Sequence, residues 1–135
     1  QMDGLVCSLN IRWVVWVGNP SITNFSLLLL TEIIERKENF GLAKSVIAGV
    51  TEIVNQYGKV IVLEDDLITS PVFLEYMNFC LNYFQDNKQV ASINAWTIEV
   101  LIEQLPDYYF LKGGDCWGWA TWSDSWKLFN PDGAY

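Results

Sequence analysis

The sequence contains no histidine, and this absence excludes several common kinds of active site. Without histidine the chain cannot build a Ser-His-Asp triad, the usual zinc sites or an imidazole general base. Basic residues are also few: eight lysines and arginines stand against sixteen acidic residues, and the net charge is −8. Such a charge argues against a nucleic-acid-binding surface, which needs a basic patch. Acid–base or metal chemistry in this chain must therefore come from carboxylates.

Cysteines are scarce and long apolar runs are missing. Cys7, Cys80 and Cys116 form no C-x-x-C pair, so we expect no zinc ribbon or disulfide framework, but buried thiols in a reducing compartment. No apolar run approaches the roughly 20 residues of a membrane helix. Asp3 stands where a signal peptide would carry basic residues. The sequence thus predicts a cytoplasmic protein, free or peripheral at the membrane, without a transmembrane segment.

Apolar and aromatic residues are plentiful enough for a folded core. Hydrophobic residues make up 51% of the 135 residues and aromatic residues 15%, so one folded domain over residues 1–135 is expected. Alternating strand and helix patterns predict an α/β fold with right-handed βαβ units and a mostly parallel sheet flanked by helices.

The expected elements follow from periodicity and turn signals. Residues 26–36 are ambiguous between a strand and a short helix. Residues 42–57 repeat apolar side chains at helical spacing up to Gly58, and a hydroxyl cap with Pro71 predicts the start of a second helix at residues 69–71. Strands are predicted at residues 11–17, 60–63, 90–95 and 108–111, the second helix is expected to run to about residue 86, residues 98–106 read as a loop, and another helix is expected from Trp119 onward.

Three consecutive acidic residues, Glu64, Asp65 and Asp66, follow the predicted strand at 60–63. In open α/β sheets, ligands bind outside the carboxyl ends of the strands. A helix cap or a solvated acidic turn is the alternative explanation, but the hydroxyls of residues 69 and 70 already supply a cap. Magnesium and manganese prefer one or two carboxylates together with substrate phosphates. The pattern therefore favours a metal or phosphate site.

Four motifs in order give the chain a resemblance to a known family. The segment 62–67, followed by 70–71 and 73–76, resembles the metal-site segment of N-acetylglucosaminyltransferase I type glycosyltransferases and of bacterial GT-A relatives in polysaccharide synthesis. Residues 36–45, 92–96 and 116–122 resemble the segments that flank it, and the likeness spans about residues 33–130. The resemblance implies an incomplete GT-A (Rossmann-like) domain, because the expected first strand and an acceptor-binding half are not matched.

The resemblance also implies roles for single residues around the acidic triplet. Asp66 would bind a Mn²⁺ or Mg²⁺ ion that bridges the diphosphate of the donor. Asp65 and Glu64 would contact the ribose or donor sugar, or orient the waters of the metal. The metal would neutralise charge on the departing nucleoside diphosphate.

Residues before the acidic triplet are implied to bind the nucleotide. Asn39 and the backbone at Gly41 would lie near the base. Arg36 or Lys44 would lie near the base or a phosphate, although basic residues on a helix surface are usually only solvated. The expected donor is a UDP- or GDP-sugar.

The tryptophan-rich end of the chain offers both core and site residues. Trp119, Trp122 and Trp126 fall at helical spacing, which favours a core role for the latter two on one helix face. Gly114, before Asp115 and Trp117, lets the backbone approach a ligand closely. Trp117, Trp119 or Asp115 is therefore a candidate to contact a sugar ring.

A carboxylate base is the remaining requirement for an inverting transfer. Asp115 and Asp124 are the candidates near this loop, although the resembled enzymes place their base further downstream. We therefore expect a metal-dependent glycosyltransferase of the hexosyltransferase type, with a glycan or lipid-linked acceptor. The alternatives are a sugar-nucleotide pyrophosphorylase, whose glycine-rich phosphate loop is not found, and a non-catalytic carbohydrate-binding module that uses the tryptophans.

Overall fold

The computed structural model describes residues 39–64, 66–96 and 109–132. The predictions for residues 11–17, 26–36 and 98–106 lie outside these residues. Within them, helices and strands alternate along the first part of the chain, and a strand and a short helix follow near its end. The elements are α1 (Leu42–Tyr57), β1 (Lys59–Val62), α2 (Phe73–Tyr83), β2 (Ser92–Asn94), β3 (Trp119–Trp122) and α3 (Ser123–Trp126).

The three strands form one sheet in the order β1-β3-β2. Both pairings are antiparallel, with Val62 and Asn94 each opposite Trp119. β1 and β2 therefore run in the same direction, but β3 lies between them and takes up the hydrogen-bonding edge of each. The predicted α/β class is confirmed. The prediction of a mostly parallel sheet is wrong for the described residues, because the last strand inserts antiparallel instead of joining an edge.

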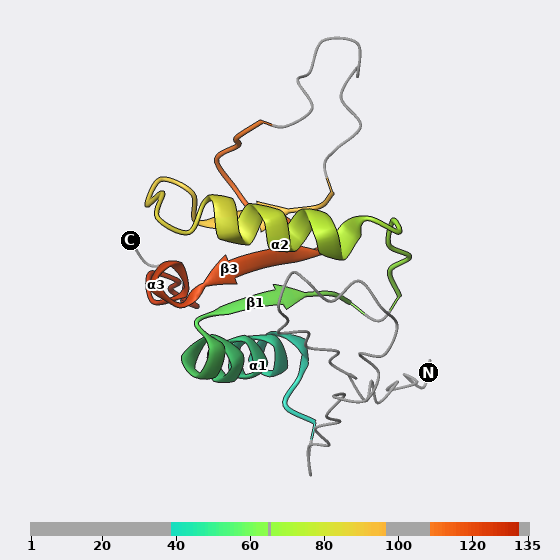
Figure 1. Cartoon of the computed structure of the whole chain (residues 1–135). Helices are drawn as coiled ribbons and strands as arrows, with labels where there is room; N and C mark the ends of the chain where they lie inside the picture. Colours follow the sequence, from blue (N-terminus) through green and yellow to red (C-terminus); the bar gives the residue numbers. More distant parts are fainter. Residues whose placement is uncertain (1–38, 65, 97–108, 133–135) are drawn as a thin grey trace.

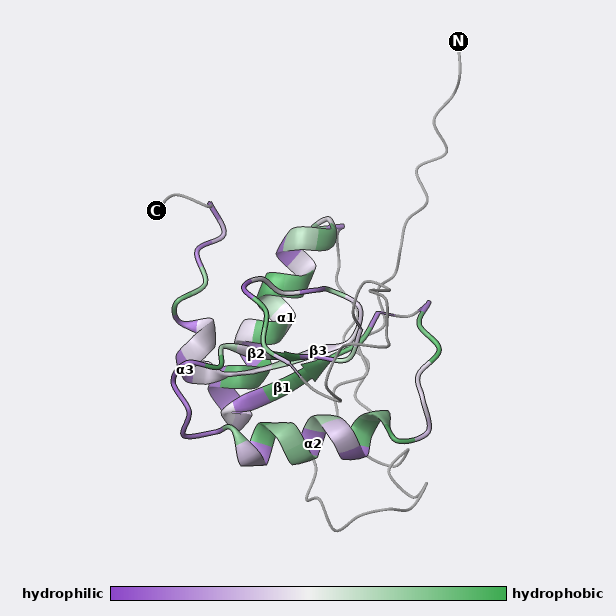
Figure 2. Cartoon of the chain, turned by 90° about the horizontal axis from the view of Figure 1, so that it is seen from above, coloured by the Kyte–Doolittle hydropathy of each residue, from purple (hydrophilic) through white to green (hydrophobic). Residues whose placement is uncertain are grey.

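Helices cover both faces of this sheet, α1 on one side and α2 on the other (Figures 1 and 2). Successive strand residues point to opposite faces, so Val60 and Val62 pack with α1 while Ile61 packs with α2. Met77 of α2 is fully buried in the hydrophobic cluster between α2 and the sheet, together with Ile61. The prediction that the strand at 60–63 is buried on both faces is confirmed, with its bounds shifted by one residue.

The two helices predicted before residue 90 exist, and the first matches its predicted bounds. α1 ends at Gly58, whose φ of 79° is left-handed and whose N–H donates to the carbonyl of Val54 at 2.9 Å. α2 begins at Phe73, later than predicted. Ser70 forms a turn before it, with its carbonyl accepting from the N–H of Phe73 at 3.0 Å and its hydroxyl from that of Val72 at 3.4 Å. α2 also ends earlier, at Tyr83.

The predicted helix from Trp119 onward is wrong. Residues 119–122 are strand β3, and only α3 after them is helical. Trp119 packs with the α1 layer and Trp122 with the α2 layer, as expected three residues apart in a strand. Hydrogen bonding of residues 119–122 to β1 on one side and to β2 on the other outweighs the helical spacing of the tryptophans. Residues 109–111 are not a strand either; residue 108 lies outside the described range.

The thiol predictions divide between two cysteines. Cys80 is buried in the α2 layer, and its burial raises the pKa of the thiol. Cys116 is exposed, which corrects the expectation of a buried thiol there, and Cys7 lies outside the described residues. None of the helices in the described ranges has the length and apolar content that a membrane crossing requires.

Candidate functional site

The sheet has two different ends. At one of them β1 and β2 end and β3 begins, so Glu64, Asn94 and Gly118 are brought to the same edge. Adjacent strands lie about 4.8 Å apart, which puts the ends of β1 and β2 roughly 10 Å from each other. We call this end of the sheet, where β1 and β2 stop and β3 starts, the acidic end. The opposite end of the sheet, where β3 is followed by α3, is called the α3 end.

Glu64 and Asp66 lie at this end of the sheet without a side-chain partner in the part of the chain that the structure describes. Glu64 is half-buried and Asp66 is exposed. Neither side chain makes a hydrogen bond or ion pair with any residue that the structure describes, although the backbone carbonyl of Glu64 accepts from the N–H of Leu67 at 3.5 Å. Asp65, the middle residue of the triplet, lies outside the described residues. Among the residues that the structure describes, the turn therefore offers carboxylate oxygens without a cation paired to them.

The loop at residues 113–118 is attached to β2 by hydrogen bonds. The N–H of Asp115 donates to Oδ1 of Asn94 at 3.1 Å, and the N–H of Ala95 donates to the carbonyl of Gly118 at 2.9 Å. Within the loop, the N–H of Trp117 donates to Oδ1 of Asp115 at 2.8 Å. One carboxylate oxygen of Asp115 thus holds the loop, and the other has no partner among the described residues.

Gly118 brings this loop against the acidic turn. It is buried and has a φ of 79°, a region that favours glycine. A Cβ at this position would lie 3.2 Å from Cε2 of Phe73 and 3.5 Å from Cδ2 of Leu63. The backbone of the tryptophan motif therefore packs directly on the end of β1 and the start of α2.

An aromatic pair lies at the same edge. Trp96, after β2, and Trp117, in the loop, contact each other edge to face with ring centroids 4.6 Å apart, and they are 41% and 45% exposed. Trp119, in contrast, stacks on Trp126 at 5.9 Å in the α1 layer. Sequence reasoning did not select Trp96 as a site residue, although its place directly after the predicted strand at 90–95 is a usable signal.

The start of α1 lies on the same side of the molecule as the end of β1 (Figure 1). Asn39 accepts the N–H of Gly41 through Oδ1 at 2.8 Å, just before the helix, and Gly41 has a φ of 76°. Lys44 is exposed in the first turn of α1. Arg36 lies outside the described residues.

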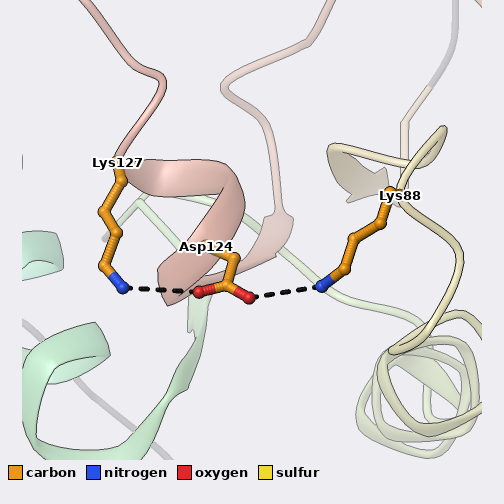
Figure 3. A network of polar contacts seen from close by, with 3 residues as sticks. All are labelled: Lys88, Asp124 and Lys127. Carbon is orange, nitrogen blue, oxygen red and sulfur yellow. Dashed lines mark hydrogen bonds and ion pairs between the residues drawn. The ribbon is translucent and has the colours of Figure 1, made fainter.

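Asp124 lies at the α3 end, away from the other predicted site residues. Its carboxylate forms ion pairs with Lys88 at 3.2 Å and Lys127 at 3.3 Å (Figure 3). The hydrogen bond from Lys88, followed by that from Lys127, lowers the pKa of Asp124 below its usual value. The structure therefore brings Glu64, Asp66, Gly114, Asp115 and Trp117 together at the acidic end but leaves Asp124 at the other end of β3.

The acidic end fits a metal that is shared with a ligand better than one enclosed by protein. Among the described residues, which omit Asp65, no three or more acidic or cysteine side chains gather in a metal-holding group. Mg²⁺ needs only one or two carboxylates when phosphates and waters complete its shell. Glu64 and Asp66 have oxygens available for this purpose.

Comparisons with known protein families, with curated protein sequences and with solved structures found no match to this chain. The relationship to glycosyltransferases therefore stays a prediction that rests on the four sequence motifs. The contacts that join the end of β1, the end of β2 and the loop at residues 113–118 do not depend on that relationship.

Proposed function

We propose that this chain is the nucleotide-sugar-binding part of a metal-dependent glycosyltransferase. One observation carries the proposal: three motifs far apart in the sequence, the acidic turn, the end of β2 and the loop at 113–118, meet at one edge of the sheet. A carboxylate-rich strand end beside exposed aromatic rings supplies groups for both parts of a sugar nucleotide, the diphosphate and the sugar.

The diphosphate would bind at the acidic turn. Asp66 would hold a Mn²⁺ or Mg²⁺ ion, with Glu64 and Asp65 supporting it, and the ion would neutralise charge on the departing nucleoside diphosphate. α1 and α2 both begin on this side of the molecule (Figure 1), and the partial positive charge of helix N-termini favours an anion there. Lys44, in the first turn of α1, adds a full positive charge on the same side.

The sugar would bind at the loop. The half-exposed faces of Trp96 and Trp117 suit the apolar face of a sugar ring, and the second carboxylate oxygen of Asp115 is left to accept from a hydroxyl. Among the residues that the structure describes, this carboxylate oxygen of Asp115 is the candidate for the general base that would deprotonate the acceptor hydroxyl. Asp124 is held by two lysines at the α3 end and has no part in this arrangement. The acceptor we propose is a glycan or a lipid-linked sugar.

Calorimetry on the 135-residue chain tests the metal and nucleotide parts together. UDP and GDP are titrated with and without Mn²⁺, and we expect binding of at least one of them to require the metal. Asp66→Ala should weaken that binding by at least about tenfold, since it removes a direct ligand. Asp124→Ala is the matched control at the α3 end and should leave the affinity unchanged.

Two results would contradict the proposal in different ways. Unchanged nucleotide affinity in Asp66→Ala means that the metal assignment is wrong. Glycan binding that is indifferent to Mn²⁺, without any nucleotide binding, means that the chain is a carbohydrate-binding module instead.

A further inference from the structure

Asn94, at the end of β2, connects three parts of the molecule. Its Oδ1 accepts the N–H of Asp115 in the loop at 3.1 Å, and its backbone carbonyl accepts the hydroxyl of Tyr76 from α2 at 3.3 Å. The next residue, Ala95, donates its N–H to the carbonyl of Gly118 at 2.9 Å. The last residue of β2 and the residue after it therefore contact α2 through Tyr76 and the loop at two points, Asp115 and Gly118.

Two further hydrogen bonds lie within the loop and shape it, whereas the bond from Ala95 attaches its last residue, Gly118. Trp117 donates its N–H to Oδ1 of Asp115 at 2.8 Å, and Gly118 donates its N–H to the carbonyl of Cys116 at 3.1 Å. Both bonds join residues two apart, so they hold the local turn. The bond from Asp115 to Asn94 spans 21 residues and is part-buried, so it decides where that turn lies relative to the sheet.

We propose that Asn94 is a positioning residue of the candidate site. Its side-chain oxygen holds the loop at residues 113–118 so that Asp115 and the Trp96–Trp117 pair lie at the acidic end. The ligand-binding part of this inference rests on the proposed function, whereas the attachment of the loop does not. Without the acceptor, the N–H of Asp115 loses its partner, and the loop stays attached only at Gly118, so that Asp115 and Trp117 are no longer held at the acidic end.

Asn82 provides a matched control at the other end of the sheet. Its Oδ1 also accepts one part-buried hydrogen bond from a distant residue, Lys59, at 2.8 Å. Asn82→Ala therefore removes the same chemical group and one hydrogen bond, but at the α3 end. Asn94→Asp is the conservative variant, because a carboxylate oxygen can still accept the N–H of Asp115.

The first measurement is the tryptophan exciton couplet in the circular dichroism spectrum, assigned to the Trp96–Trp117 pair by its loss in Trp96→Phe. We expect Asn94→Ala to lose most of this signal while the helical signal remains. Asn94→Asp and Asn82→Ala should keep it. If Asn94→Ala does not fold, Asn94→Ser takes its place, since the shorter serine side chain does not reach the loop.

The second measurement is the Mn²⁺-dependent affinity for a UDP- or GDP-sugar in the same variants, because the loop is the part proposed to contact the sugar. Asn94→Ala should weaken it about fivefold, the equivalent of one ordinary hydrogen bond, and Asn82→Ala should not change it. A couplet that survives in Asn94→Ala overturns the inference whatever binds. A lost couplet with wild-type affinity also overturns it, because the loop then lies outside the site, and the proposed function stands. If the wild-type chain binds no nucleotide, the proposed function fails and the couplet alone decides the attachment of the loop.

Discussion

The carboxylates at the two ends of the sheet differ in whether a basic side chain pairs with them. At the α3 end, Asp124 is bound by two lysines, and Lys59 donates to Asn82. At the acidic end, Glu64 and Asp66 have no side-chain partner among the described residues. The same residue type is thus paired at one end and left available at the other. The lysines offset the charge of Asp124, whereas Glu64 and Asp66 have no such cation among the described residues and could share one with a ligand.

The largest difference between the ends should come from their glycines. Gly118 at the acidic end and Gly58 at the α3 end share a φ of 79°, but only Gly118 is closely packed, by Phe73 and Leu63. Replacement by alanine should lower the free energy of unfolding by about 1 kcal/mol at Gly58, from backbone strain. At Gly118 overpacking should add about 1–3 kcal/mol. Urea denaturation of the two variants measures this, and equal losses would mean that the loop does not pack on the acidic turn.

For the tryptophans, in contrast to the glycines, replacement should lower the free energy of unfolding more at the α3 end than at the acidic end. Trp126 in α3 donates from Nε1 to the hydroxyl of Thr51 at 2.9 Å, whereas Trp96 is half-exposed. Trp126→Phe should therefore cost about 1 kcal/mol or more, and Trp96→Phe less than about 0.5 kcal/mol. Adding Thr51→Val to Trp126→Phe should recover part of the loss, because it removes the unsatisfied hydroxyl. A larger loss at Trp96 would show that the exposed pair is structural.

The carboxylates should respond with opposite signs. In low salt and without metal, Asp66→Asn should raise the free energy of unfolding by a few tenths of a kcal/mol, because it removes repulsion near Glu64. Asp124→Asn should lower it, because two lysines lose their partner. Thermal melts at low and high salt measure both effects, which should shrink together in high salt. Destabilisation by Asp66→Asn would reveal a hidden partner for this carboxylate.

The smallest effect is the pH dependence at Asp124. Its pKa in the folded chain is lowered from 3.8 by the lysines, so its contribution to stability is complete above that unfolded value. The contribution is lost as the pH falls through the lower folded pKa. The difference between the wild-type chain and Asp124→Asn should therefore be constant from neutral pH to about pH 5 and vanish in stronger acid. Denaturation at several pH values tests this, and a difference already lost at pH 5 would contradict it.

Local patterns predicted the parts of the fold that depend on local interactions. The helix at 42–57, its stop at Gly58 and the buried strand after it were visible from spacing and turn residues, since both signals act within a few residues. The position of the acidic triplet at a strand end followed from them. The start of α2 was misplaced because Ser70 and Pro71 serve equally well in a turn and in a helix cap.

From the sequence alone follow the absence of histidine, the α/β class and the acidic residues after a buried strand. Only the tertiary structure decided that residues 119–122 are a strand and that Asp115, Trp117 and Trp96 join the acidic end while Asp124 does not. The physical reason is that β3 forms where the facing edges of β1 and β2 need hydrogen-bond partners. That demand arises from segments 25 to 63 residues away and leaves no trace in the spacing of the tryptophans.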